Sequence, residues 1–234
     1  MNRTAISWTD FTWNPVTGCD KVSPGCQNCY AEAITLRYGR SFAVTTHPER
    51  LSQVKSLKSG SRVFVNSMSD LFHEKVGFDF TLGVWRSMLA RPDITFQILT
   101  KRPGQMLGFV NEAIARGYGP IPPHIWLGVS VESTLYLPRL DVLRKVPAYV
   151  RFVSFEPLLE DIKDPDLSLI SWAIVGGESG PNHRPLHPQW VRNLRDACLE
   201  ASVPFFFKQW GGARPGGEAL LDGVAYHEFP EAIH

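Results

Sequence analysis

The chain has 234 residues, a formal net charge of +1, 44% apolar residues and 20% charged residues, an ordinary globular composition long enough for one large domain. The near-neutral charge gives no overall basic field of the kind that nucleic-acid-binding proteins carry, although a local basic groove is compatible with it. The sequence starts without an apolar signal-peptide core and holds no run of about 18 apolar residues, so we expect no membrane span and a cytoplasmic location.

Short apolar runs alternate with helical patterns along most of the chain. The strands are predicted, in chain order, at residues 6–11, 62–65, 95–99, 125–129, 149–153, 172–175 and 204–207. The helices are predicted at residues 28–37, 80–90, 105–116, 139–145 and 188–201, with a loop and a short helix between residues 40 and 60. Residues 213–234 are rich in Gly, Pro and acidic residues and are predicted to form an irregular C-terminal extension.

This alternation predicts an α/β fold with a parallel sheet. About seven βα units fit a partial or closed TIM-like (βα) barrel of about six to seven strands, formed as a single domain by residues 1–212. A flavodoxin-type sheet is the alternative. Polar residues follow many successive strands. This pattern favours a barrel over a flavodoxin-type sheet, because in a barrel all the strand ends meet at one open end.

Three of the four cysteines, Cys19, Cys26 and Cys29, lie within eleven residues, with six residues and then two residues between them. In a reducing compartment, clustered cysteines indicate metal ligands or catalysts rather than disulfides. An iron–sulfur cluster held by three cysteines would keep one iron open for a substrate or cofactor. The helix expected after Cys29 would place the site near a helix N-terminus, which favours thiolate charge.

Two other interpretations of these cysteines stay open. A zinc site would need a fourth ligand, for which His47 or His73 are candidates. The three could also be free structural thiols, as we expect for Cys198 on the apolar face of the last helix.

Several segments together resemble one family. They are Trp8-Thr9-Asp10, Trp13-Asn14-Pro15, Gly18-Cys19, Lys21 to Cys26, Asn28 to Glu32, Val65 to Phe72, Leu99 to Pro103, Leu127 to Glu132, Ser154 to Leu158 and Val175 to Gly180. The chain is similar, from about Ile6 to Gly212, to a phage-associated three-cysteine-motif family that itself resembles the radical S-adenosylmethionine superfamily. That superfamily usually has three residues between the first two cysteines and an aromatic residue before the third, whereas this chain has six residues and Asn28.

The resemblance implies a metal-binding enzyme in which Cys19, Cys26 and Cys29 hold a 4Fe–4S cluster. The open iron would bind S-adenosylmethionine, and one electron would cleave this cofactor to a 5′-deoxyadenosyl radical.

The resemblance also implies that residues at strand ends bind the cofactor. Ser67, Ser69 and Asp70 would contact the methionine amine, and Lys101 with Arg102 would pair with its carboxylate or with a phosphate. Ser130 and Glu132 would hold ribose hydroxyls, and Glu178 would bind ribose or a base. The alternatives are helix capping for Asp70, Ser130 and Glu132, a tight turn at Glu178 and solvated charges for Lys101 and Arg102.

Two further residues are candidates for catalysis. Glu156 follows an apolar strand, so its carboxylate is expected to be partly buried and to need a cation, with Arg151, Lys101 and Lys208 as candidates. Lys208 follows three phenylalanines and is predicted to point into the open end of the barrel.

The first hypothesis is a radical S-adenosylmethionine enzyme. A nucleic acid or nucleotide substrate follows only by analogy, because the superfamily includes a DNA photoproduct lyase. The second is a metal-binding module, with zinc or a structural cluster, that acts with a partner protein and performs no radical chemistry. The third is a nucleic-acid-binding protein with a regulatory cluster, for which Lys101, Arg102, Arg184 and Lys208 would form a basic groove.

Overall fold

The computed structural model describes residues 2–213 and 218–231. In this part of the chain, eight strands form one sheet in the order β1-β2-β5-β6-β7-β8-β9-β10. β1 (Asn2–Arg3) pairs antiparallel at one edge, and the other seven strands are all parallel. These are β2 (Phe11–Trp13), β5 (Arg62–Val65), β6 (Thr95–Thr100), β7 (Ile125–Ser130), β8 (Arg151–Phe155), β9 (Trp172–Gly176) and β10 (Phe205–Gln209).

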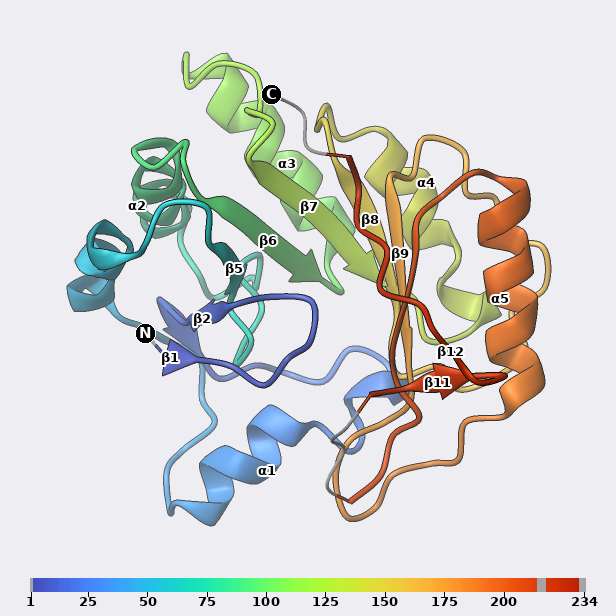
Figure 1. Cartoon of the computed structure of the whole chain (residues 1–234). Coiled ribbons are helices and arrows are strands. Elements are labelled where there is room, and N and C mark those ends of the chain that lie inside the picture. The colour runs from blue at the N-terminus through green and yellow to red at the C-terminus, as the bar shows by residue number, and fades with distance from the viewer. Residues whose placement is uncertain (1, 214–217, 232–234) are drawn as a thin grey trace.

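The seven parallel strands follow one another in sequence order, which is the connectivity of a (βα) barrel. β10 pairs with β9 and stands at the end of the sheet, so the sheet is an open, curled half-barrel. Figure 1 shows its strands fanned from β2 to β9 with helices α2 to α5 along one side. The predicted partial TIM-like barrel is therefore confirmed in its open form.

The helices lie close to where the apolar periodicity predicts them. They are α1 (Tyr30–Arg37), α2 (Phe78–Leu89), α3 (Pro103–Ala115), α4 (Pro138–Arg144) and α5 (Pro188–Glu200). Three of them begin at a proline, whose fixed φ suits the first helical turn. Short 3-10 helices η1 (Pro24–Cys26), η2 (Pro48–Ser56) and η3 (Thr134–Tyr136), and the pair β3 (Val16–Thr17) with β4 (Thr45–Thr46), fill the connections.

Among the described residues, none of the helices has the length and apolarity that crossing a membrane requires.

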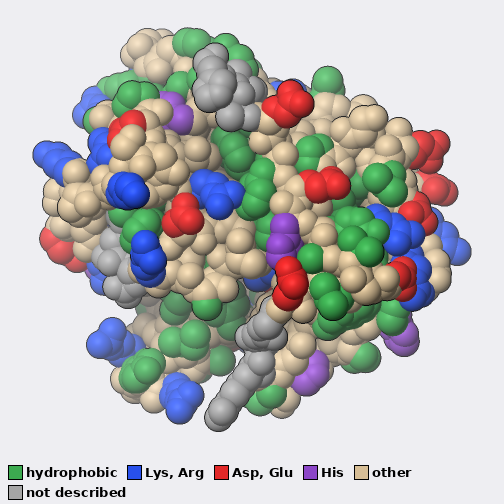
Figure 2. Space-filling model, in the orientation of Figure 1, with side chains coloured by type: hydrophobic (Ala, Val, Ile, Leu, Met, Phe, Trp, Pro, Cys, Tyr) green, Lys and Arg blue, Asp and Glu red, His purple; other side chains and the backbone are tan. Residues whose placement is uncertain are grey.

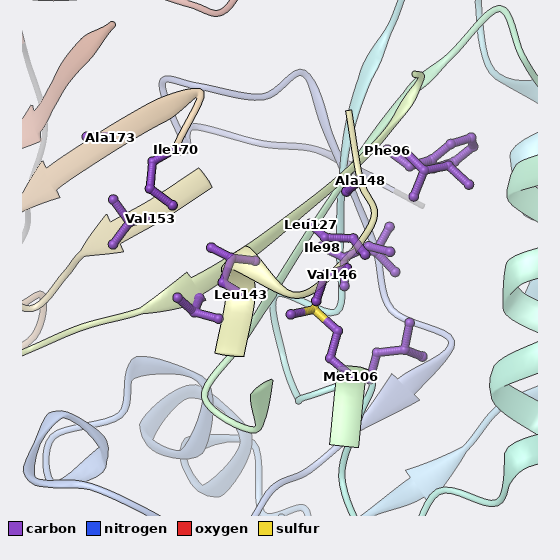
Figure 3. Close-up of a cluster of buried hydrophobic side chains, with 14 of the residues drawn as sticks. Phe96, Ile98, Met106, Leu127, Leu143, Val146, Ala148, Val153, Ile170 and Ala173 are labelled. Carbon is purple, nitrogen blue, oxygen red and sulfur yellow. The ribbon is translucent and has the colours of Figure 1, made fainter. Parts of the chain in front are cut away.

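The sheet separates two apolar clusters because successive strand side chains point to opposite faces. The larger cluster lies between the sheet and the helices, and Figure 3 shows part of it around Ile98, Met106 and Leu127. The inner cluster fills the concave face and consists of Trp8, Phe64, Trp126, Val150, Phe152, Trp172, Ile174 and Phe206. The half-barrel is therefore packed on both faces at this level, which leaves its carboxyl end as the place for polar side chains.

The first predicted strand, residues 6–11, is wrong in its position. Only Phe11 belongs to β2, and residues 7 and 8 form a turn. The apolar side chains of that segment were expected to line a strand, but the Trp8 ring instead packs in the inner cluster, 4.7 Å from the ring of Phe64. The strand predicted at residues 149–153 is likewise displaced and runs from Arg151 to Phe155.

The C-terminal segment is more regular than the predicted irregular extension. β11 (Leu220–Leu221) and β12 (Val224–Ala225) form a hairpin, after which the Phe229 ring stacks on Trp172 with centroids 5.1 Å apart. Residues 214–217 and 232–234 of that prediction lie outside the described residues. The division of the chain at residue 212 stays a prediction.

Gly128 tests the packing of the inner cluster. A Cβ at this position of β7 would lie 2.6 Å from ring atoms of Phe152. We expect Gly128→Ala to lower the free energy of unfolding in urea by about 1–3 kcal/mol, as overpacked cores do. Gly108→Ala, in α3 with open space around it, should instead raise it by up to about 1 kcal/mol. Equal effects of the two substitutions would contradict this packing.

Candidate functional site

The cysteine loop, residues 14–29, lies across the carboxyl end of the half-barrel. The amide of Gly18 donates to the carbonyl of Met68 at 3.0 Å, directly after β5, and Gly18 also bridges to Ser69. At its far end the loop passes into α1, which Figure 1 shows on the side to which the arrowheads of β6 and β7 point. The three cysteines of the loop therefore stand at the end of the sheet where the predicted site residues gather.

The cysteines of this loop differ in environment from the fourth cysteine. Cys19, Cys26 and Cys29 are free thiols and partly exposed, with Cys26 at the end of η1 and Cys29 at the start of α1. Cys198 is fully buried on α5, as its apolar helix face predicts. Only the three loop thiols are accessible to a bound group.

Basic side chains lie next to two of these thiols. The Arg102 guanidinium donates to Sγ of Cys19 at 3.5 Å. Burial and the charge of Asp70 nevertheless raise the pKa of the Cys19 thiol to about 11. Burial acts the same way on Cys26, but the Lys101 charge and hydrogen bonds from the loop around Ser23 outweigh it and hold its pKa below the usual value. Cys26 is therefore predisposed to the thiolate form that binds metals.

Within residues 2–213 and 218–231, no three His, Cys, Asp or Glu side chains are grouped so that they could hold a metal ion. Sulfur ligands of a single zinc ion all lie about 2.3 Å from it. A 4Fe–4S cluster takes its cysteine ligands on separate irons, so they need not converge on one point.

The residues after β5 join that strand to the cysteine loop. Ser67 shares hydrogen bonds with Asn14, and the Ser69 hydroxyl donates to the Val16 carbonyl at 2.8 Å. Asp70 is buried and accepts from the Thr100 hydroxyl at 2.7 Å and from the Arg102 guanidinium at 3.3 Å. It also accepts from the backbone amides of Phe72 and Lys101, each at 3.0 Å. The structure thus brings the three predicted residues together, and each makes hydrogen bonds within the chain.

A buried ion-pair cluster follows β7. The Glu132 carboxylate is fully buried and lies 2.8 Å from Nζ of Lys101 and 2.8 Å from Arg139. Arg139 also donates to the backbone carbonyl of Ser130. The Ser23 hydroxyl of the cysteine loop donates to the same carboxylate. The two cations and the hydroxyl hold the pKa of Glu132 below its usual value against the opposing effect of burial.

Glu178 has a similar place after β9. Its carboxylate forms an ion pair with Arg184 and accepts from the side-chain amide of Asn28 at 2.9 Å. Burial opposes the charge, but these bonds keep the pKa of Glu178 below its usual value. Close packing requires glycine at position 177, because a Cβ there would lie 2.2 Å from the Trp210 carbonyl oxygen. The backbone before Glu178 therefore approaches the backbone of Trp210 closely, so the glycine is explained by this contact within the chain.

Glu156 forms an ion pair with Lys208, one of its three candidate partners. Both side chains are mostly buried, and Lys208 donates to the Glu156 carboxylate together with the Gln209 amide. Arg151, another candidate partner, instead donates to backbone carbonyls. The pair lies at the ends of β8 and β10.

Tyr30 combines an exposed ring with an engaged hydroxyl. The side chain is 38% exposed, and its hydroxyl donates to the Ser67 carbonyl at 2.6 Å. Burial of that hydroxyl, with the nearby charges of Cys29 and Glu156, raises the pKa of Tyr30 well above its usual value. Tyr30 and Cys29 also line a hollow of about 220 Å³ between α1 and the loop after β9.

The sequence interpretation missed several residues of the site. Ser23, Asn28 and Arg139 contact the predicted carboxylates but were not assigned to the site. Arg184 is a candidate for a basic groove in the sequence interpretation, whereas in the structure it pairs with Glu178. The sequence did mark Asn28 as unusual, because it stands directly before Cys29, where the superfamily that the chain resembles has an aromatic residue. Arg139 carried none, since a charged residue in a short helix is usually solvated.

Asp70 is predicted to be essential for the stability of this end of the sheet. Asp70→Asn would leave the buried Arg102 without its buried carboxylate, which should cost about 3 kcal/mol in urea unfolding. Asp141→Asn, which breaks a surface pair with Arg144, should change it by less than about 0.5 kcal/mol. A small effect at Asp70 would contradict the assigned contacts.

The lowered pKa of Glu132 predicts a dependence of stability on pH. A carboxylate whose pKa is lower in the folded state stabilises it fully above the unfolded value, 4.5, and less as the pH falls through the folded value. We therefore expect the free energy of unfolding to decrease more steeply between about pH 5 and pH 3 in the wild type than in Glu132→Gln. Glu112→Gln, which changes an exposed pair with Arg116, should keep the wild-type slope. Parallel curves for wild type and Glu132→Gln would refute this.

Solved structures of spore photoproduct lyase are similar to this chain in fold. A double mutant of that lyase with bound AdoMet and dinucleoside spore photoproduct matches with a TM-score of 0.50 at 12% identity, over 82% of this chain and 62% of that chain. The lyase complexed with dinucleoside spore photoproduct matches with a TM-score of 0.47 at 12% identity, over 79% and 59%. This chain thus spans 59–62% of the length of these structures, and at such identity the similarity concerns the fold.

No sequence among curated proteins matches this chain. A family profile does, over residues 3–230, which is nearly the whole chain. The chain therefore belongs to the family described as "Protein of unknown function (DUF5131)".

Proposed function

We propose that this protein is a radical S-adenosylmethionine-type enzyme whose 4Fe–4S cluster is held by Cys19, Cys26 and Cys29. The observation that carries the proposal is the position of the cysteine loop. Three free, partly exposed thiols lie on one loop across the carboxyl end of an open parallel half-barrel. In such barrels that end carries the active site.

The donor set supports this group. Three thiols without disulfide partners offer the cysteine ligation that a 4Fe–4S cluster takes. Arg102 at Cys19 and Lys101 near Cys26 offset the negative charge that thiolate ligation brings to this end of the sheet. When bound, the cluster would supply the electron that cleaves S-adenosylmethionine.

The chain's own polar residues at the strand ends would surround the cofactor. Ser67, Ser69 and Asp70 after β5, Lys101 after β6 and Ser130 at the end of β7 would form its wall. Glu132, predicted to hold ribose hydroxyls, and Glu178, predicted to bind ribose or a base, instead accept hydrogen bonds from the cysteine loop.

Glu156 and Lys208 are proposed to act on the substrate. Their hydrogen-bonded pair is mostly buried at the ends of β8 and β10, where it can hold a proton and pass it to or from a bound group. A nucleic acid or nucleotide substrate is proposed by analogy, because a spore photoproduct lyase of similar fold was solved with AdoMet and a dinucleoside bound.

The experiment is anaerobic reconstitution of the full chain with iron and sulfide, followed by electron paramagnetic resonance of the reduced protein. We expect a 4Fe–4S signal that changes shape when S-adenosylmethionine is added, because the cofactor would bind the open iron. Cys26→Ala should lose the signal. Cys198→Ala, which removes a buried thiol remote from the loop, should keep it.

Two results would contradict the proposal. One is binding of a single zinc ion per chain with no cluster, which would favour a metal-binding module instead. The other is a cluster that forms equally well in Cys26→Ala, because the ligand assignment would then be wrong.

A further inference from the structure

The cysteine loop is held to the sheet at a first point by Glu132. Its carboxylate accepts from the Ser23 hydroxyl, and the loop passes so close that a Cβ on Gly25 would lie 2.4 Å from Cγ of Glu132. Because Lys101 and Arg139 fix the same carboxylate at the end of β7, this contact cannot shift without disturbing a fully buried ion-pair cluster. The segment of the loop directly before Cys26 thus rests on a fixed support.

A second support contacts the loop on both sides of Cys26, at Asn28 and at Pro24. The Asn28 side-chain amide donates to Glu178 at 2.9 Å and to the Asn182 carbonyl at 2.8 Å. Arg184, which is paired with Glu178, also donates to the carbonyl of Pro24 at 3.0 Å. This second support stands after β9, two strands away from the first along the sheet.

We propose that Glu132 and Glu178 are positioning residues that fix the cysteine loop in its ligand-presenting shape before anything binds to it. The two supports grip residues 23–25 and residue 28, so the backbone on both sides of Cys26 and directly before Cys29 is held. We call these contacts the loop clamp. The inference rests on the proposed function only for the identity of what the cysteines bind.

The charges of the loop clamp suit this role. Each carboxylate is matched by at least one cation, with Lys101 and Arg139 at Glu132 and Arg184 at Glu178. The acceptors of the clamp therefore add no uncompensated negative charge beside thiolates, which would raise the cost of ionising them. A preformed loop also avoids ordering three ligands at the moment of binding.

The test measures the reactivity of each cysteine in the apoprotein. Under anaerobic, reduced conditions, the full chain is treated with a maleimide, and labelling of each cysteine is followed by mass spectrometry. Gly25→Ala pushes the loop away from Glu132, and Asn28→Ala removes the donor to Glu178. In both variants we expect Cys26 and Cys29 to be labelled about fivefold faster, since a lost hydrogen bond or contact releases the loop.

Matched controls separate the clamp from general loosening. Gly104→Ala introduces a Cβ in α3 with no other part of the chain within 4 Å, and Asn193→Ala removes an amide that donates to Asp161 and not to a carboxylate of the clamp. Both should keep wild-type labelling rates. Labelling of the buried Cys198 should stay slow in every variant.

The proposal would be overturned if Cys26 and Cys29 were labelled at the wild-type rate in both clamp variants. It would also be overturned if the labelling of Cys198 became faster by the same factor. In the reconstituted protein, the clamp variants should also lose iron to a chelator faster than the controls. If the wild type assembles no cluster, the proposed function fails while the labelling rates still decide the role of the clamp.

Discussion

The buried carboxylate of Glu132 is the interaction on which the rest of the site depends. A fully buried charge is costly unless it is paired, and here Lys101, Arg139 and Ser23 supply the partners from three different segments. The carboxylate therefore fixes the ends of β6 and β7, the start of α4 and the cysteine loop relative to one another. A hydrophobic group could fill the same volume but could not select these partners.

Positive charge beside the cysteines follows from the same arrangement. Lys101 and Arg102 are neighbours at the end of β6, yet their side chains serve different acidic partners, Glu132 and Asp70. Both nevertheless act on thiols of the loop, Lys101 on Cys26 and Arg102 on Cys19. One strand end thus links the acidic residues of the sheet to the sulfur atoms, and the two carboxylates keep the cations in place.

Much of the architecture could be predicted from the sequence because strands and helices leave periodic patterns. The open, seven-stranded parallel sheet and the helices α2 to α5 follow that rhythm. The segment around Trp8 was predicted wrongly as a strand, because the Trp8 side chain packs inside the half-barrel without belonging to a strand. The three cysteines and the Glu156–Lys208 pair were found from spacing and from the need of a buried charge for a partner. The contact of Arg139 with Glu132 could not be predicted, since only the folded chain shows which charged helix residue turns inward. The position of Asn28 before Cys29 marked it in the sequence, but its partner Glu178, 150 residues away, is brought to it only by the fold.

An open sheet leaves two strand edges, and exposed edges invite pairing between molecules. The chain covers both with its own terminal segments. At one edge, the two-residue β1 lies antiparallel on β2. At the other, the segment after β12 pairs with β10, where the Phe207 amide donates to the Tyr226 carbonyl at 2.9 Å and His227 bridges to Phe206. Figure 2 shows the face that includes these segments, with acidic and basic side chains interspersed. The C-terminal segment therefore occupies the edge of β10 with which another molecule could otherwise pair, so the half-barrel is open while this edge is covered.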